Sequence, residues 1–181
     1  MTTSESTTSA PIVTGERADL LQALAKQRHF LGFTARDLTD DQARQRTTAS
    51  ELCVGGLIKH VTSVERGWIG FMLEGPSAMP DFTAMTEEDW AARAADFRLL
   101  PEETLAGVLA EYEKVAAETD ELVRTLPDLD RRWPLPKAPW TEPGAEWSVR
   151  SVLIHIVAET AQHAGHADII RESLDGAKSM G

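Results

Sequence analysis

Apolar residues recur every three or four positions in four long segments of this 181-residue chain. That spacing lines them up on one face of an α-helix, and no comparable stretch alternates polar and apolar residues as a half-buried strand does. The predicted helices cover residues 16–38, 50–75, 102–126 and 148–174, and Ser50 and Ser148 are the expected N-caps of the second and the fourth. Because each helix must bury its apolar face against another, the pattern predicts an all-α fold, a four-helix bundle.

Two long connections separate these helices. Residues 76–101 contain three aromatic residues and a predicted short helix over 87–97, and residues 127–146 contain five prolines and two tryptophans. The prolines argue against regular structure in the second connection. A further short helix over 40–46 is expected after Thr39, which has the side chain of a helix cap. Connections of this length usually cross a bundle or cover a site.

The charge balance excludes two classes of partner. The formal net charge is −11, from 29 acidic and 18 basic side chains. A chain this acidic is poorly suited to bind the phosphates of nucleic acids or anionic lipid headgroups. The sequence also lacks a run of about 18 apolar residues, so it predicts no membrane span. We therefore expect neither a nucleic acid nor a membrane as partner.

The single cysteine, Cys53, excludes an intramolecular disulfide and a cysteine-rich zinc site. A lone thiol fits a reducing compartment, and the N-terminus lacks the basic start and apolar core of a signal peptide, so a cytoplasmic location is expected. Cys53 itself is expected to be a small core residue. Residues 1–14 are small and polar and predict a disordered tail, followed by one domain over 15–181.

The fourth predicted helix carries an unusual stripe of polar side chains. Three of the five histidines, His155, His163 and His166, lie there together with Glu159. At about 100° per residue, the four fall within roughly 80° of one another, on a face that core helices normally fill with Leu, Ile and Val. Glu159 and His163 are four residues apart, so both side chains can reach one cation.

A third ligand must come from a facing helix, and His60 is the predicted donor. It lies within the second helix in an apolar and small stripe, with Gly56 one turn before it and Gly67 about two turns after it. Glycine inside a helix costs about 1 kcal/mol relative to alanine, which is tolerated where a neighbour approaches closely. Two imidazoles and one carboxylate suit Zn²⁺, and also Ni²⁺ or Fe²⁺. The alternative, that these histidines are hydrogen-bonded core residues, stays open from spacing alone.

Two stretches resemble signatures of the DinB/YfiT-like superfamily. LIKHVTSVERGW at 57–68 resembles its second-helix signature, and ETAQHAGHADIIRE at 159–172 resembles the fourth-helix signature of its actinobacterial branch. The resemblance covers residues 16–176 and implies a bundle whose metal is held by one residue of the second helix and two of the fourth. Many members carry His-x-x-x-His on the fourth helix. Here Glu159 takes the first place, as in the mycothiol-dependent isomerases, whose zinc is held by two histidines and one glutamate.

The resemblance also implies a function. Members with assigned activity commonly depend on a small thiol, either as S-transferases that use mycothiol or bacillithiol or as isomerases with mycothiol as cofactor. A divalent-metal-dependent S-transferase that conjugates a small electrophile through a metal-bound mycothiol thiolate is therefore expected. His166 and His155 would then bond to the metal ligands, orient a ligand or shuttle a proton. A homodimer is also expected, because bundles of this kind often pair.

Two other functions remain open. The Glu-x-x-x-His pair favours a mycothiol-dependent isomerase, but that enzyme type usually carries a further C-terminal domain, and the sequence given stops soon after the fourth helix. The S-transferase is therefore the first expectation. The other alternative is a non-catalytic stress-response protein that keeps its metal for structure. Such a metal would have a closed coordination shell without an exchangeable water.

Overall fold

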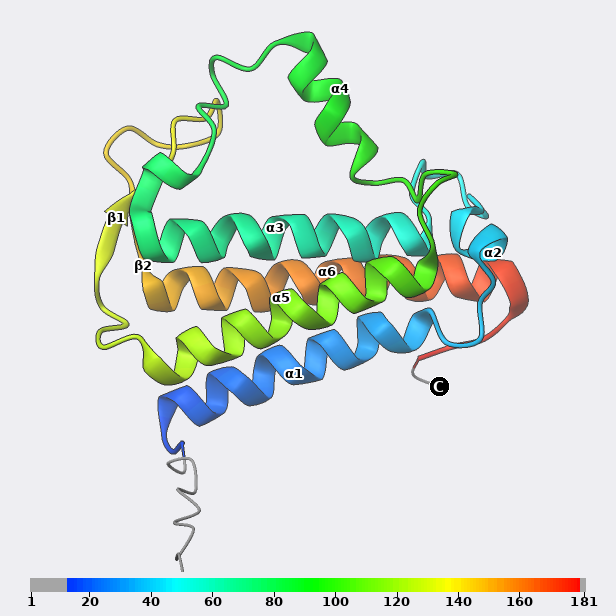
Figure 1. The fold of residues 1–181 in the computed structure, drawn as a ribbon, viewed down its shortest axis with the longest axis horizontal. Coiled ribbons are helices and arrows are strands. Elements are labelled where there is room, and N and C mark those ends of the chain that lie inside the picture. The colour runs from blue at the N-terminus through cyan, green and yellow to red at the C-terminus, as the bar shows by residue number, and fades with distance from the viewer. Residues whose placement is uncertain (1–12, 180–181) are drawn as a thin grey trace, which may run out of the picture.

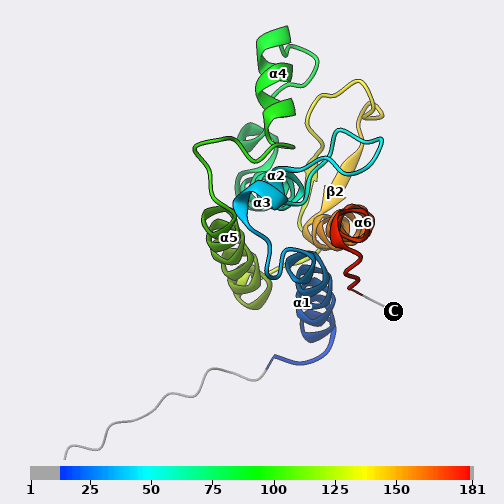
Figure 2. The ribbon, with the colours of Figure 1, turned by 90° about the vertical axis from the view of Figure 1, so that its right-hand side faces the viewer.

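Four long helices run side by side in the computed structural model, which describes residues 13–179 (Figure 1). They are α1 (Glu16–Thr34), α3 (Val54–Glu74), α5 (Leu105–Thr125) and α6 (Val149–Asp175). Helix α1 packs on α6, and α3 packs on both α5 and α6, so that the four surround a common core (Figure 2). The predicted four-helix bundle is confirmed. The prediction of a tail over 1–14 lies almost wholly outside the described residues.

Short elements lie in the connections between the long helices. They are α2 (Asp40–Arg44), the 3-10 turn η1 (Gly75–Ala78), α4 (Glu87–Ala95), β1 (Arg132–Pro134) and β2 (Glu146–Ser148). Helices α2 and α4 confirm the two predicted short helices, and each begins with a threonine whose hydroxyl accepts a backbone N–H of the first turn. None of the described helices is both long enough and apolar enough to span a membrane.

The absence of regular structure predicted for 127–146 is wrong, because β1 and β2 pair as a short antiparallel ribbon. Trp133 lies opposite Trp147 in this ribbon. The amide of Leu135 donates to the carbonyl of Ala145 at 2.9 Å. Pro134 therefore occupies the position between two bonded pairs, where the ribbon needs no N–H from it. A proline is tolerated at this position of the ribbon. The number of prolines in the segment could not predict that, because it does not show which residues pair.

Helix α3 begins later than predicted and with a different cap. The sequence suggested Ser50 as the N-cap, but the hydroxyl of Ser50 accepts the amide of Leu52 at 3.1 Å in a local turn. The N-cap is Cys53, whose buried thiol accepts the amide of Gly56 at 3.4 Å. Cys53 is thus buried as expected, and its sulfur accepts a hydrogen bond at the start of the helix.

The ends of the other long helices also have local causes. Helix α6 begins at the predicted cap, Ser148, which accepts the amide of Ser151 at 3.1 Å, and it ends at Gly176 with a positive φ of 79°. Helix α1 was expected to reach residue 38 but ends at Thr34. There Arg171 of α6 donates to the carbonyl of Thr34 at 2.7 Å. This contact ties the C-terminal end of α1 to α6.

The core consists of two apolar clusters with a polar layer between them. Leu31 and Val61 belong to one cluster, at the end of the bundle near α2, whereas Leu24 and Ile69 belong to the other. Polar residues lie at or near the boundary between the two clusters on every long helix. We call them the polar layer: Arg28 on α1, Glu65 on α3, Thr119 and Asp120 on α5, and Thr160 on α6.

The centre of the polar layer is an ion pair between Arg28 and Glu65. Glu65 is only 1% exposed, and the hydroxyl of Thr119 donates to the same carboxylate at 2.6 Å. The guanidinium of Arg28 also bonds to Asp120, at 2.7 Å. Three helices therefore meet at one pair of opposite charges. Burial beside this pair raises the pKa of Tyr112 above its ordinary value, so the phenol stays neutral.

Removing Glu65 should destabilise the bundle strongly. In Glu65→Ala the charge of Arg28 stays buried with Asp120 alone as its partner, and we expect a loss of about 3 kcal/mol in the free energy of unfolding. The matched control is Arg66→Ala, which breaks the ion pair with Glu111 on the half-exposed surface. That variant should lose less than about 1 kcal/mol. Urea denaturation followed by circular dichroism measures both, and equal losses would contradict this account of the layer.

Candidate metal centre

The three predicted ligands meet between two helices. His60 comes from α3, and Glu159 and His163 come from α6. Each offers a ligand atom, and all of these atoms lie within 4.8 Å of one another. The Oε1 atom of Glu159 is 3.3 Å from Nε2 of His163 and 3.6 Å from Nε2 of His60. Two imidazole nitrogens and one carboxylate oxygen therefore converge, as in a divalent-metal site of a helical bundle.

The electrostatics of this group suit a cation. Interactions with the imidazoles of His163 and His60 hold the pKa of Glu159 well below its ordinary range. Its carboxylate is therefore ionised at neutral pH, as a metal ligand must be. The side chains of His60, Glu159 and His163 are only 8%, 23% and 12% exposed. Such seclusion strengthens the attraction of the group for a cation.

Each imidazole of the group has a neighbour that fixes its ring. The ring of His60 stacks on Phe97, with centroids 3.9 Å apart and an interplanar angle of 21°. The Nδ1 atom of His163 lies 3.4 Å from Nδ1 of His166. Coordination through Nε2 of His163 requires its Nδ1–H to donate to His166. The structure thus places His166 next to His163, one of the metal-ligand candidates. From the sequence, Phe97 could be recognised only as one of the aromatic residues of the first long connection. Its contact with His60 depends on the path of that connection in the folded chain.

Gly56 explains how Phe97 reaches His60. A methyl group added at Gly56 would lie 2.0 Å from the carbonyl oxygen of Phe97, so only glycine lets this backbone pass against α3. The close approach predicted for Gly56 is confirmed. The same prediction for Gly67 is wrong, because a methyl group there would meet only Met79, in ordinary contact at 3.7 Å.

His155 lies apart from the three converging ligands. Its ring packs against Trp68 and Trp147, with centroid distances of 5.1 Å and 5.0 Å. Burial lowers the pKa of His155, so the imidazole is neutral at neutral pH. The two tryptophans also stack on each other at 5.1 Å. His155 is therefore part of an aromatic wall one helical turn before Glu159.

A cavity of about 540 Å³ opens above the converging ligands. His60, Glu159 and His155 line it from the bundle. Both long connections line it as well, one through Phe82 and the other through Trp140. The connections therefore cover a site. The volume is within the range of small-molecule sites, which is about 300–1,000 Å³.

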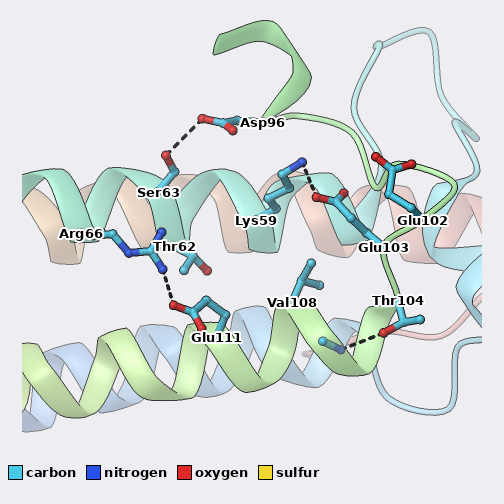
Figure 3. A pocket seen from close by; sticks show the side chains of 11 residues that line it. Lys59, Thr62, Ser63, Arg66, Asp96, Glu102, Glu103, Thr104, Val108 and Glu111 are labelled. Carbon is cyan, nitrogen blue, oxygen red and sulfur yellow. Dashed lines mark hydrogen bonds and ion pairs between the residues drawn. The ribbon is translucent and has the colours of Figure 1, made fainter. Parts of the chain in front are cut away.

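A second pocket lies along a different face of α3, between it and α5 (Figure 3). Both basic side chains that line it are already paired: Lys59 bonds to Glu103 at 2.7 Å and Arg66 to Glu111 at 2.6 Å. None of the predicted site residues lines it. Because both of its basic side chains have acidic partners and none of the converging ligands faces it, we take the cavity above His60 as the candidate site.

The substitution Gly56→Ala tests how the site is supported. The added methyl group must displace the backbone at Phe97, so we expect a loss of stability of about 3 kcal/mol and a zinc affinity weakened by roughly tenfold. In the control Gly165→Ala, on an exposed part of α6, the methyl group meets no neighbour within 4 Å. That variant should gain up to about 1 kcal/mol and keep its zinc affinity. Thermal melts and zinc titration against a competing chelator measure both, and unchanged zinc affinity in Gly56→Ala would refute the supporting role.

Solved structures with a similar fold include two bacterial proteins. One is a conserved protein from Enterococcus faecalis, with a TM-score of 0.64 and 14% identity over 91% of this chain and 100% of that one. The other is YfiT from Bacillus subtilis, with a TM-score of 0.61 and 18% identity over 90% of this chain and 89% of that one. YfiT is described as "a probable metal-dependent hydrolase with an unusual four-helix bundle topology". At these identities the likeness establishes the DinB/YfiT-like fold alone.

Sequence comparison identifies the family. No curated protein matches the chain significantly. A family model described as Mycothiol-S-transferase matches residues 19–176, which include all four long helices except the first few residues of α1. The match also spans His60, Glu159 and His163. The chain therefore belongs to the mycothiol-S-transferase family.

Proposed function

We propose that this protein is a divalent-metal-dependent S-transferase that joins mycothiol to a small electrophile. The observation that carries the proposal is the convergence of His60, Glu159 and His163 at one side of a cavity of about 540 Å³. Membership of the mycothiol-S-transferase family supports the choice of thiol. The chemistry of such a reaction needs a thiolate held next to an electrophilic carbon.

The donor set fits a catalytic metal. Three protein ligands, two of them imidazoles and one a carboxylate, are typical of zinc sites that keep a further position for substrate. We infer that Zn²⁺ is the resident metal, although Ni²⁺ and Fe²⁺ accept the same donors. When bound there, the cation would lower the pKa of a coordinated thiol so that the nucleophilic thiolate persists at neutral pH.

The surrounding residues would orient the ligands and receive the reactants. Phe97 holds the ring of His60, and His166 holds that of His163, so that both Nε2 atoms point toward Glu159. In the transfer, the sulfur of mycothiol forms a C–S bond with the electrophile. The bond to the leaving group breaks with its electron pair on that group. We assign His155, which is neutral and lines the cavity, to accept the thiol proton.

Metal content tests the ligand assignment. Protein purified without chelators should contain about one divalent metal per chain, and His163→Ala should lose it because only two donors remain. His29→Ala is the matched control, since His29 stacks on Phe33 of α1 and takes no part in the converging group. Inductively coupled plasma mass spectrometry measures the metal. Wild-type protein that takes up no metal even after incubation with zinc would disprove the site.

Conjugation of mycothiol with monochlorobimane tests the activity. We expect the metal-loaded protein to accelerate formation of the fluorescent thioether by at least about a hundredfold over the uncatalysed rate. Removing the metal with a chelator should abolish the acceleration, and added zinc should restore it. Transfer consumes mycothiol in proportion to product, whereas an isomerase would return it unchanged. Failure to conjugate monochlorobimane or any other electrophile of a panel would reject the S-transferase.

A further inference from the structure

Among residues 13–179, Arg93 is the only lysine or arginine that lines the cavity above the converging ligands. It lies on α4, and its guanidinium carbon is 5.2 Å from the centre of the Phe82 ring. Phe82 is buried and lines the same cavity, so the stacking keeps the cation at the cavity wall. Within residues 13–179, no carboxylate forms an ion pair with Arg93. Its N–H donors are therefore free for a ligand.

Two other arginines, one in the polar layer and one beside the end of α1, already have acidic partners. Arg28 bonds to Glu65 and Asp120 in the polar layer, and Arg171 bonds to Asp175 and to the end of α1. In a chain with a net charge of −11, an unengaged guanidinium beside an aromatic cavity stands out. An anion entering the cavity would be repelled by the protein as a whole, so it needs such a local partner.

The acidic residues of the cavity do not remove this charge. Glu159 lies with His60 and His163 in the proposed metal site, and Glu142 is exposed. Mycothiol offers no anionic group to Arg93 either, because that thiol is an N-acetylated cysteine in amide linkage to an amino sugar and carries no carboxylate or phosphate. The positive charge of Arg93 is therefore available for the second reactant.

We propose that the electrophile is a small aromatic or apolar carboxylate whose anionic group binds Arg93. This inference rests on the proposed S-transferase function and names the substrate class of the same site. Arg93 and Phe82 belong to the wall formed by the first connection, whereas the metal-ligand candidates belong to α3 and α6. The carboxylate would thus be held on one wall while the reacting carbon lies toward the other. The apolar body of the substrate would pack among Trp68, Trp147 and Phe82.

Guanidinium groups bind carboxylates through paired, charge-assisted hydrogen bonds, which a neutral amide cannot replace. Helix α4 buries none of its residues and stands clear of the four long helices (Figure 1). A substitution at Arg93 should therefore leave the fold intact. Arg98 offers a matched control, because it lies on the same connection, is exposed and does not line the cavity.

Binding of two unreactive probes to the metal-loaded protein tests the inference. The probes are 3,5-dinitrobenzoate and 3,5-dinitrobenzamide, which share a ring but differ in charge and lack a leaving group. Quenching of tryptophan fluorescence reports their binding, since Trp68, Trp140 and Trp147 line the cavity. We expect wild type and Arg98→Gln to bind the carboxylate about tenfold more tightly than the amide, and Arg93→Gln to lose that preference.

Two outcomes would overturn the inference. Equal binding of the two probes by wild-type protein would mean that the cavity does not select an anion. Alternatively, Arg93→Gln could keep the preference, which would place the carboxylate on the metal or elsewhere. Either result leaves the role of Arg93 without support.

A parallel reaction separates this inference from the proposed function. With 4-chloro-3,5-dinitrobenzoate, the sulfur of mycothiol forms a C–S bond as the C–Cl bond breaks. Chloride leaves with the bonding electrons, and the thiol proton passes to His155 and from there to the buffer. If the Arg93-dependent preference is found but neither this acid nor its amide is conjugated, S-transfer fails while the anion site stands. If both are conjugated at equal rates by wild type and Arg93→Gln, S-transfer stands and the anion site fails.

Discussion

The buried ion pair between Arg28 and Glu65 is the constraint on which the rest of the bundle depends. Apolar clusters above and below it would allow helices to slide, but sliding by one turn would bury an unpaired charge against apolar side chains. The polar layer therefore fixes the height of α3 against α1 and α5. Its members also adjoin the metal-ligand candidates, since Thr160 follows Glu159 directly. By fixing the height of α3, the layer also fixes the height of His60, which lies on the same helix.

The site divides its tasks between rigid helices and long connections. Helices α3 and α6 supply the donor atoms, whose spacing a metal demands within a few tenths of an ångström. The connections supply Phe97, which supports His60, and also Phe82, Arg93 and Trp140, which shape the cavity. Binding residues often lie on loops that a rigid scaffold positions, and here the helices hold the converging donors while the connections shape the cavity.

Features that depend on neighbours along one helix could be predicted from the sequence, whereas features that depend on the path of a connection could not. Glu159 and His163 share a face because they are four residues apart, and that holds in any helix. His60 followed from the need for a facing donor and from the family resemblance. The stacking of Phe97 and the placement of Arg93 arise only when residues 76–101 fold over α3. Ser50 failed as a cap because an alternative local hydrogen bond used its hydroxyl. The homodimer remains a prediction.

X-ray absorption at the zinc edge tests the central claim most directly, since it reports the atoms bound to the metal. For zinc-loaded protein alone, the account predicts nitrogen and oxygen neighbours at about 2.0–2.2 Å and no sulfur. Addition of mycothiol should introduce one sulfur neighbour at about 2.3 Å. Sulfur bound before mycothiol is added would point to Cys53 and contradict the assignment of His60, Glu159 and His163. A spectrum unchanged by mycothiol would contradict the thiol chemistry.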